Sequence, residues 1–155
     1  MKTLIMLSAF PASGKSTWAK NFKATHDNVV ILNSDDIRME VTNGNYQDHT
    51  RQKEVWELFE KRIHEYGKQD GVILILDALN DTNEVRLKYL ATTPEFDKKV
   101  LILLPSDLEK SIKLNNLRDP AVRVPEDVLV QLVNKFEEPN EEVYSLLNEI
   151  RYVYW

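Results

Sequence analysis

The chain has 155 residues, a net charge of −5 and no cysteine, with 43% hydrophobic and 29% charged residues. This length and composition are typical of one globular domain, so we expect residues 1–155 to form a single unit. The lack of cysteine excludes a disulfide framework and a thiolate metal site. The acidic net charge argues against a protein that coats long nucleic acids, although a few arginines are enough to hold one strand end.

No apolar run approaches the roughly 18 residues that are needed to cross a membrane. The short apolar N-terminus leads into Gly14-Lys15-Ser16 rather than into a signal-peptide cleavage site. We therefore expect no membrane partner and a cytoplasmic location.

Short aliphatic segments alternate with helical patterns along the chain. Buried strands are expected at residues 3–8, 29–33, 72–76 and 100–104, with a weaker fifth candidate at 150–154. Helices are expected at residues 16–23, 35–41, 49–68, 83–91, 107–117 and 125–137. This alternation predicts an α/β fold, with a parallel sheet of four to five strands and helices on both faces. Ligands of such sheets bind at the carboxyl ends of the strands.

A phosphate-binding loop is expected between the first strand and the first helix. Such a loop needs inward-facing backbone N–H groups at a helix N-terminus and a cation that reaches the phosphates. Gly14 allows the tight turn, Lys15 supplies the cation and Ser16 offers a hydroxyl to Mg²⁺. The residues that we expect to hold the nucleotide phosphates are Pro11, Ala12, Ser13, Gly14, Lys15, Ser16 and Thr17.

The pattern G-x-x-x-x-G-K-[ST] is met except at its first position, where Ala9 stands. If this position needs positive φ, an alanine there is strained by about 1 kcal/mol. The alternative interpretation of the motif is a chance Gly-Lys-Ser at a helix cap, which the strand before it and the helix after it make improbable.

Polar residues 33–38 follow the second strand, at the same edge of the sheet as the phosphate loop. A carboxylate there can accept the proton of a hydroxyl that attacks the γ-phosphate. Asp35 and Asp36 both suit this role, and both also suit the first turn of a helix, where acids are favoured. Arg38 lies one turn further on and is either a bidentate contact to a phosphate on the acceptor or a solvated helix residue.

Residues 77–80 follow the third strand at the same edge. Asp77 is placed to orient Mg²⁺ through a water molecule or to bond the acceptor, and Asn80 can donate or accept in the same pocket. The alternative for Asp77 is a strand-end or helix-capping role.

Residues 115–125 join two helices and contain Arg118 and Arg123. A segment of this kind can fold over ATP as a lid and bring positive charge to the transferring phosphoryl group. We expect both arginines to contact the nucleotide; the alternative is two exposed loop arginines.

The phosphate loop, the two polar runs and the arginine lid, in this order, resemble the kinase domain of bacteriophage polynucleotide 5′-hydroxyl kinase and its P-loop relatives. The resemblance runs from residue 2 to about residue 132 and is closest over residues 11–19, including Trp18. It implies a three-layer P-loop kinase fold with ATP and Mg²⁺ as cofactors. The roles that it implies are ATP phosphate binding by Lys15, Mg²⁺ binding by Ser16, general base catalysis by Asp35, an acceptor contact by Arg38 and a transferring-phosphate contact by Arg118.

Departures from that family fall at acceptor and lid positions. Leu79 stands where relatives usually carry threonine, and Leu114 stands where the polynucleotide kinase carries a second lid arginine. We expect no phosphatase domain of the kind that the bifunctional phage enzyme carries, and hence no removal of a 3′-phosphate.

The expected function is an ATP-dependent kinase whose acceptor is the 5′-hydroxyl of DNA or RNA. The alternative is a P-loop kinase for a sugar, nucleoside or antibiotic hydroxyl, which the net charge and the missing lid arginine favour. A nucleotide-binding module without catalysis is the third hypothesis.

Overall fold

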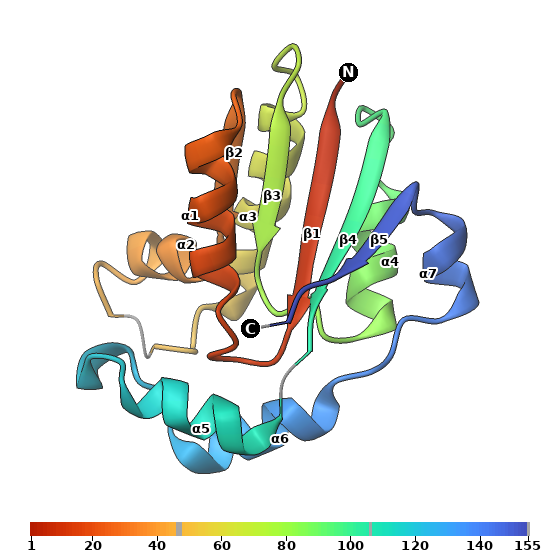
Figure 1. Ribbon diagram of the computed structural model, residues 1–155. Helices are drawn as coiled ribbons and strands as arrows, with labels where there is room; N and C mark the ends of the chain where they lie inside the picture. The colour runs from red at the N-terminus through yellow and green to blue at the C-terminus, as the bar shows by residue number, and fades with distance from the viewer. Residues whose placement is uncertain (46–47, 106, 155) are drawn as a thin grey trace.

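A five-stranded sheet forms the centre of the computed structural model, which describes residues 1–45, 48–105 and 107–154 (Figure 1). Its strand order is β2-β3-β1-β4-β5, and neighbouring strands pair in parallel. The strands are β1 (Thr3–Ala9), β2 (Val29–Asn33), β3 (Ile73–Asp77), β4 (Lys98–Leu104) and β5 (Glu149–Tyr152). The prediction of a parallel α/β sheet is therefore confirmed, including its weak fifth strand.

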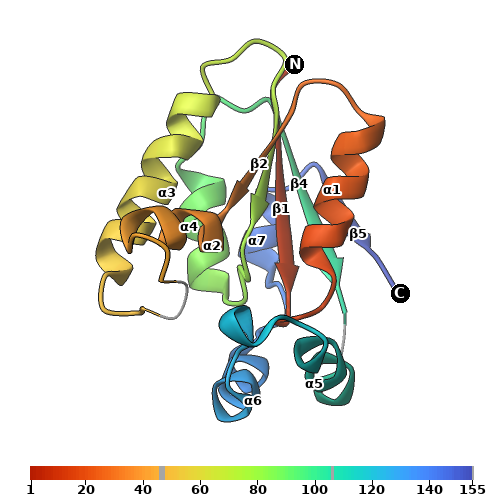
Figure 2. The ribbon, with the colours of Figure 1, turned by 90° about the vertical axis from the view of Figure 1, so that its left-hand side faces the viewer.

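Helices cover both faces of this sheet, with α1 on one side and α3 and α4 on the other (Figure 2). The helical segments are α1 (Lys15–Thr25), α2 (Ser34–Val41), α3 (Gln52–Tyr66), α4 (Asn83–Ala91), α5 (Leu108–Asn116), the 3₁₀ turn η1 (Pro120–Val122), α6 (Glu126–Lys135) and α7 (Glu141–Ser145). The sequence patterns did not predict η1 or α7, because elements this short show no helical periodicity.

The two faces of the sheet carry separate apolar clusters, because successive strand residues point to opposite sides. Leu4 and Met6 of β1 belong to the cluster that includes Phe59 of α3 and Tyr89 of α4. The cluster on the α1 side consists of Ile5, Leu7, Ala9, Ala19, Val29, Ile75, Val100, Ile102 and Leu104. Burial on both faces explains why the strands appear in the sequence as nearly unbroken aliphatic runs.

Parallel pairing brings the carboxyl ends of β1, β2 and β3 to the same edge of the sheet. Asn33, at the end of β2, is the register partner of Asp77, at the end of β3. Helices α5 and α6 lie across this edge, below the strand ends in both ribbon views (Figures 1 and 2). The fold therefore assembles the polar runs, the phosphate loop and the expected lid at one end of the molecule.

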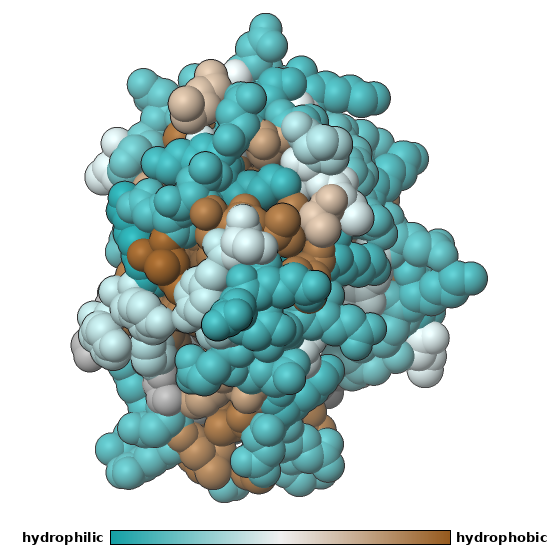
Figure 3. All heavy atoms as spheres, turned by 90° about the vertical axis from the view of Figure 1, so that its right-hand side faces the viewer, coloured by the Kyte–Doolittle hydropathy of each residue, from teal (hydrophilic) through white to brown (hydrophobic). Residues whose placement is uncertain are grey.

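Polar and charged residues cover most of the face that lies beyond the edge strand β5, and apolar atoms reach this surface in separate patches (Figure 3). Across the described ranges, no helix combines the length and the apolar character that crossing a bilayer requires.

Candidate active site

The loop between β1 and α1 has the shape of a phosphate cradle. Gly14 has a φ of 91°, and α1 starts directly after it without a side-chain cap and without an acidic residue in its first turn. Helices α2, α4 and α5, in contrast, each begin with an Asn, Thr or Asp side chain that accepts a backbone N–H. The amides and positive dipole end of α1 are thus left for an external anion.

The departure at Ala9 causes no backbone strain. Ala9 is the buried last residue of β1, and its N–H donates to the carbonyl of Leu79 at 3.0 Å. Within the described part of this loop, positive φ falls on Gly14 and on Ala12, whose φ is 53°. The expected cost of about 1 kcal/mol therefore applies to Ala12 and not to Ala9.

Lys15 lies where four charged groups meet. Burial lowers the pKa of Lys15 from its ordinary value, the carboxylates of Asp77 and Asp35 raise it, and the guanidinium of Arg118 lowers it. These groups come from α1, from the end of β3, from α2 and from the segment after α5. The structure thus brings the expected phosphate lysine, both expected carboxylates and the expected lid arginine to one place.

Asp77 provides a fit for Mg²⁺ beside the loop. Its side chain is 2% exposed, and Oδ2 accepts hydrogen bonds from Ser16 Oγ at 2.9 Å and from Asn33 Nδ2 at 2.8 Å. The other oxygen, Oδ1, is buried and has no hydrogen-bond partner among the described residues. A buried carboxylate oxygen next to a serine hydroxyl suits a hard cation or a water molecule bound to it.

Asn33 holds the start of α2 and thereby places Asp35. Its Oδ1 accepts the N–H groups of Asp35 at 2.8 Å and of Asp36 at 3.0 Å, which fixes the first turn of the helix. Burial raises the pKa of Asp36, the carboxylates of Asp35 and Asp77 raise it further, and Lys20 lowers it. The ambiguity between Asp35 and Asp36 is thus a choice between two neighbouring carboxylates in one helical turn.

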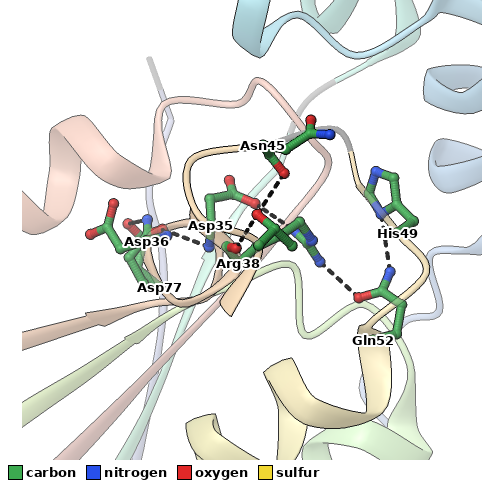
Figure 4. A network of polar contacts seen from close by, with 9 residues as sticks. Asp35, Asp36, Arg38, Asn45, His49, Gln52 and Asp77 are labelled. Carbon is green, nitrogen blue, oxygen red and sulfur yellow. Dashed lines mark hydrogen bonds and ion pairs between the residues drawn. The ribbon is translucent and has the colours of Figure 1, made fainter. Parts of the chain in front are cut away.

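Arg38 is buried and bonds to residues of its own chain (Figure 4). Its Nη1 donates to Asp35 Oδ1 at 2.9 Å, and its Nη2 donates to Gln52 Oε1 at 3.0 Å. Gln52 is the first residue of α3 and contacts His49 through its Nε2. The observed arrangement makes Arg38 a support for the Asp35 carboxylate, with two of its guanidinium nitrogens bonded within the chain.

Asn80 lies beneath the loop rather than in the cavity beside it. It is 3% exposed with a φ of 44°, and its Nδ2 donates to the carbonyl of Leu7 at 2.7 Å. Its own carbonyl accepts from Ser8 Oγ at 2.7 Å and from Arg86 Nε at 2.9 Å. These contacts tie the end of β1 to the loop after β3, and the acceptor contact of Asn80 stays a prediction.

Arg86 is a fully buried side chain that the sequence analysis did not select. Besides the Asn80 carbonyl, it donates to Ser8 Oγ from Nη2 at 3.0 Å and to Asn83 Oδ1 from Nη1 at 3.0 Å. Its guanidinium carbon lies 5.2 Å from the ring centre of Phe136, which in turn packs edge-on against Phe10 of the phosphate loop. A helix arginine gives no sequence signal that separates this buried role from a solvated one.

The segment after α5 brings Arg118 toward the phosphate loop. No hydrogen bond or ion pair of the Arg118 side chain is recorded within the described ranges, so its guanidinium is open to an anion. Arg123 has a different position, because its Nη2 donates to the carbonyls of Asn116 and Arg118, each at 3.0 Å. We expected both lid arginines to contact the nucleotide. In the structure, the side chain of Arg123 bonds to main-chain carbonyls of the lid, whereas the side chain of Arg118, within the described part of the chain, does not.

A cavity of about 480 Å³ lies between α1, α2 and the lid. Its lining residues are Ser16, Lys20, Ile31, Asn33, Asp35, Asp36, Met39, Asp77 and Val122. This volume falls within the range of about 300–1,000 Å³ that is usual for small-molecule sites. Four lining residues could not be predicted from the sequence, because each has an ordinary strand, helix or turn position: Lys20, Ile31, Met39 and Val122.

A protein-family model, described as chromatin associated protein KTI12, matches residues 2–144 of the chain. The chain belongs to the KTI12 family. The sequence resemblance to P-loop kinases is thus confirmed in its coarse form, but the matching family is KTI12 and not the phage polynucleotide kinase specifically.

Solved structures support the same fold. A chain of the Pnkp1/Rnl/Hen1 RNA repair complex has a TM-score of 0.74 and 23% identity, and the match covers 86% of this chain and 43% of that one. Kti12 from Chaetomium thermophilum in complex with ADP-AlF3 has a TM-score of 0.72 and 17% identity, with 98% and 89% covered. A gluconokinase from Sinorhizobium meliloti 1021 has a TM-score of 0.60 and 14% identity, with 98% and 82% covered. The chain spans less than half the length of the RNA repair protein that it matches.

Proposed function

We propose that this chain is an ATP-dependent phosphotransferase that moves the γ-phosphate to a hydroxyl acceptor, and that the 5′-hydroxyl of a polynucleotide is this acceptor. The observation that carries the proposal is the position of Asp35. It lines the same cavity as Ser16 and Asp77 and lies close enough to Lys15 to act on its charge. A carboxylate at that point can take the proton of an attacking hydroxyl, a step that a switch or a simple nucleotide-binding protein does not require.

Each residue has a separate task in this proposal. The loop amides and Lys15 bind the β- and γ-phosphates. Ser16 and Asp77 would hold Mg²⁺, which would offset negative charge on the phosphate oxygens. Asp35, oriented by its 2.9 Å bond from Arg38, accepts the proton of the acceptor hydroxyl. A bond forms between the acceptor oxygen and the γ-phosphorus, the bond to the β-phosphate oxygen breaks, and ADP leaves. Arg118 stabilises the charge on the transferring group.

The preference for a polynucleotide end rests on similarity in fold. The RNA repair structure and this chain share their architecture over 86% of the chain, and the polar runs are in the order that the phage kinase family shows. The solved structure of Kti12, which has the same fold, is a complex with ADP-AlF3, and this supports nucleotide binding by this chain.

A small-molecule acceptor is the second candidate, and the charge of the cavity favours it. Its lining contains the carboxylates of Asp35, Asp36 and Asp77 but only Lys20 as a cation. An anionic acceptor enters such a cavity less readily than a neutral or cationic hydroxyl compound. The similarity in fold to a gluconokinase supports a small-molecule acceptor in general but not the charge argument, because gluconate is an anion.

The decisive experiment is transfer from γ-labelled ATP to a panel of acceptors: 5′-hydroxyl oligonucleotides of DNA and RNA, nucleosides and sugars. We expect label on the oligonucleotides, and loss of that label with Lys15→Met and with Asp35→Asn. Transfer to a monomeric compound with inert oligonucleotides selects the second candidate. ATP binding without transfer to any acceptor, and with Asp35→Ala behaving as the parent, indicates a non-catalytic module.

A further inference from the structure

Arg118 lies in the turn between α5 and α6, which is the expected lid. Arg118 follows the end of α5, and its N–H donates to the carbonyl of Asn115 at 3.1 Å. The turn then passes through η1, where Asp119 Oδ1 accepts the N–H of Ala121 at 2.9 Å. A long cationic side chain at such a turn has many rotamers, so its aim depends on how rigidly the turn itself is held.

Asn115 joins the two ends of this turn. Its side chain is 3% exposed, its Nδ2 donates to the carbonyl of Val124 at 2.6 Å, and its Oδ1 accepts the N–H of Val124 at 3.0 Å. This pair of bonds copies the pairing of two peptide groups, which only a planar amide with one donor and one acceptor can do. Asparagine is a poor residue for a helix interior, so its place in the last turn of α5 is explained by this contact.

Arg123 fixes the same turn from within. Its Nη2 donates to the carbonyl of Asn116 and to the carbonyl of Arg118 itself, each at 3.0 Å. The N–H of Arg118 thus donates to the main-chain carbonyl of Asn115, and its carbonyl accepts from the Arg123 side chain, while the Asn115 side chain closes the turn at Val124. The N–H and the carbonyl of Arg118 are both bonded, and its guanidinium is close enough to Lys15 to lower the pKa of that lysine.

We propose that Asn115 and Arg123 are positioning residues, whose bonds across the turn hold Arg118 against the transferring phosphate. This inference rests on the proposed phosphotransferase function. It changes the expected role of Arg123 from a nucleotide contact to a support. Neither residue touches the reacting atoms, so their removal acts only through the loss of the Arg118 geometry.

The test is a double-mutant cycle of Asn115→Ala with Arg118→Ala, with the exposed neighbour Asn116→Ala as the matched control. We expect Asn115→Ala to lower kcat for phosphate transfer about tenfold, the effect of losing one charge-assisted hydrogen bond in the transition state. Affinity for ADP stays at the parent value, because the phosphate loop is untouched. In the Arg118→Ala background, Asn115→Ala changes kcat less than about twofold.

Additive losses in the two backgrounds overturn the inference, as does a parent-like kcat of Asn115→Ala. Asn115→Asp keeps the size and the acceptor but loses the donor, so it gives the same answer if the alanine variant does not fold. Arg123→Ala is expected to follow Asn115→Ala and to lower kcat with unchanged affinity for ADP. If Arg123→Ala weakens ADP binding, Arg123 contacts the nucleotide, and its positioning role is wrong.

A binding measurement separates this inference from the proposed function. Calorimetry measures the affinities of the parent and of each variant for AMP-PNP, which carries a γ-phosphate group, and for ADP, which does not. We expect Arg118→Ala and Asn115→Ala to weaken the binding of AMP-PNP but not that of ADP. If the parent transfers phosphate to no acceptor, but both variants lose the preference for AMP-PNP over ADP, the proposed function is wrong and the positioning role stands. If only Arg118→Ala loses it, the positioning role is wrong.

Discussion

Replacing Arg86 by methionine is expected to destabilise the protein by about 2–4 kcal/mol, because the substitution removes a buried guanidinium that donates hydrogen bonds to three acceptors. Methionine keeps most of the apolar stem but loses the bonds to Ser8 Oγ, the Asn80 carbonyl and Asn83 Oδ1. At about 1.5 kcal/mol for a bond to a charged group, these three acceptors account for about 4.5 kcal/mol. Burial lowers the pKa of Arg86, so its charge is desolvated at a cost that offsets part of this sum.

Urea unfolding followed by tryptophan fluorescence measures the effect, since the chain has three tryptophans. The matched control is Arg62→Met, which removes an ion pair to Glu40 whose side chains are 27% and 53% exposed. That exposed pair is expected to contribute about 1 kcal/mol or less. If Arg86→Met lowers the free energy of unfolding by less than about 1 kcal/mol, or if both variants lower it equally, then burial does not make Arg86 important for stability.

Three further substitutions test single features of the site. Ala12→Gly is expected to leave the free energy of unfolding within about 0.5 kcal/mol of the parent, since the relief of backbone strain at its φ of 53° offsets the added conformational freedom of the unfolded chain. A decrease of more than about 1 kcal/mol in the free energy of unfolding, measured by calorimetry, contradicts this. Asp77→Asn is expected to weaken the Mg²⁺ dependence of ATP binding about tenfold with the fold retained, and an unchanged Mg²⁺ titration counts against the assignment. Asp36→Asn is expected to raise Tm at pH 7 but not at pH 3. The raised pKa of Asp36 means that its charged form is disfavoured in the folded state, so stability falls as pH rises through that pKa; a lowered Tm at pH 7 contradicts the sign.

Much of the architecture could be predicted from pattern alone. Doubly buried strands give unbroken aliphatic runs, and the end of β2 at Asn33 and the bounds of α4 at Asn83 and Ala91 match the expected positions. The phosphate loop could be placed because its glycine, lysine and serine have fixed geometric tasks between a strand and a helix. The edge of the sheet where Asp35 and Asp77 meet follows from parallel pairing.

The partners of individual side chains could not be predicted in the same way. Arg38 bonds to Gln52 across the turn between α2 and α3, and no local pattern indicates how that turn closes. Arg123 bonds to carbonyls of its own loop, whose positions depend on the Asn115 contact to Val124. Ala9 was suspected of strain because the motif shows residue types and not dihedral angles. These details depend on how each loop closes and on its dihedral angles, which residue spacing does not show.

We propose that Asp35 makes this P-loop protein a transferase to a hydroxyl rather than a hydrolase or a switch. The most direct measurement is a single-turnover experiment that follows labelled γ-phosphate into a 5′-hydroxyl oligonucleotide and into inorganic phosphate. The account predicts that the label enters the oligonucleotide, and that Asp35→Asn slows this step by about 10²–10⁴-fold with ATP affinity unchanged. Release of all label as inorganic phosphate, at a rate that neither the acceptor nor Asp35→Asn alters, contradicts it.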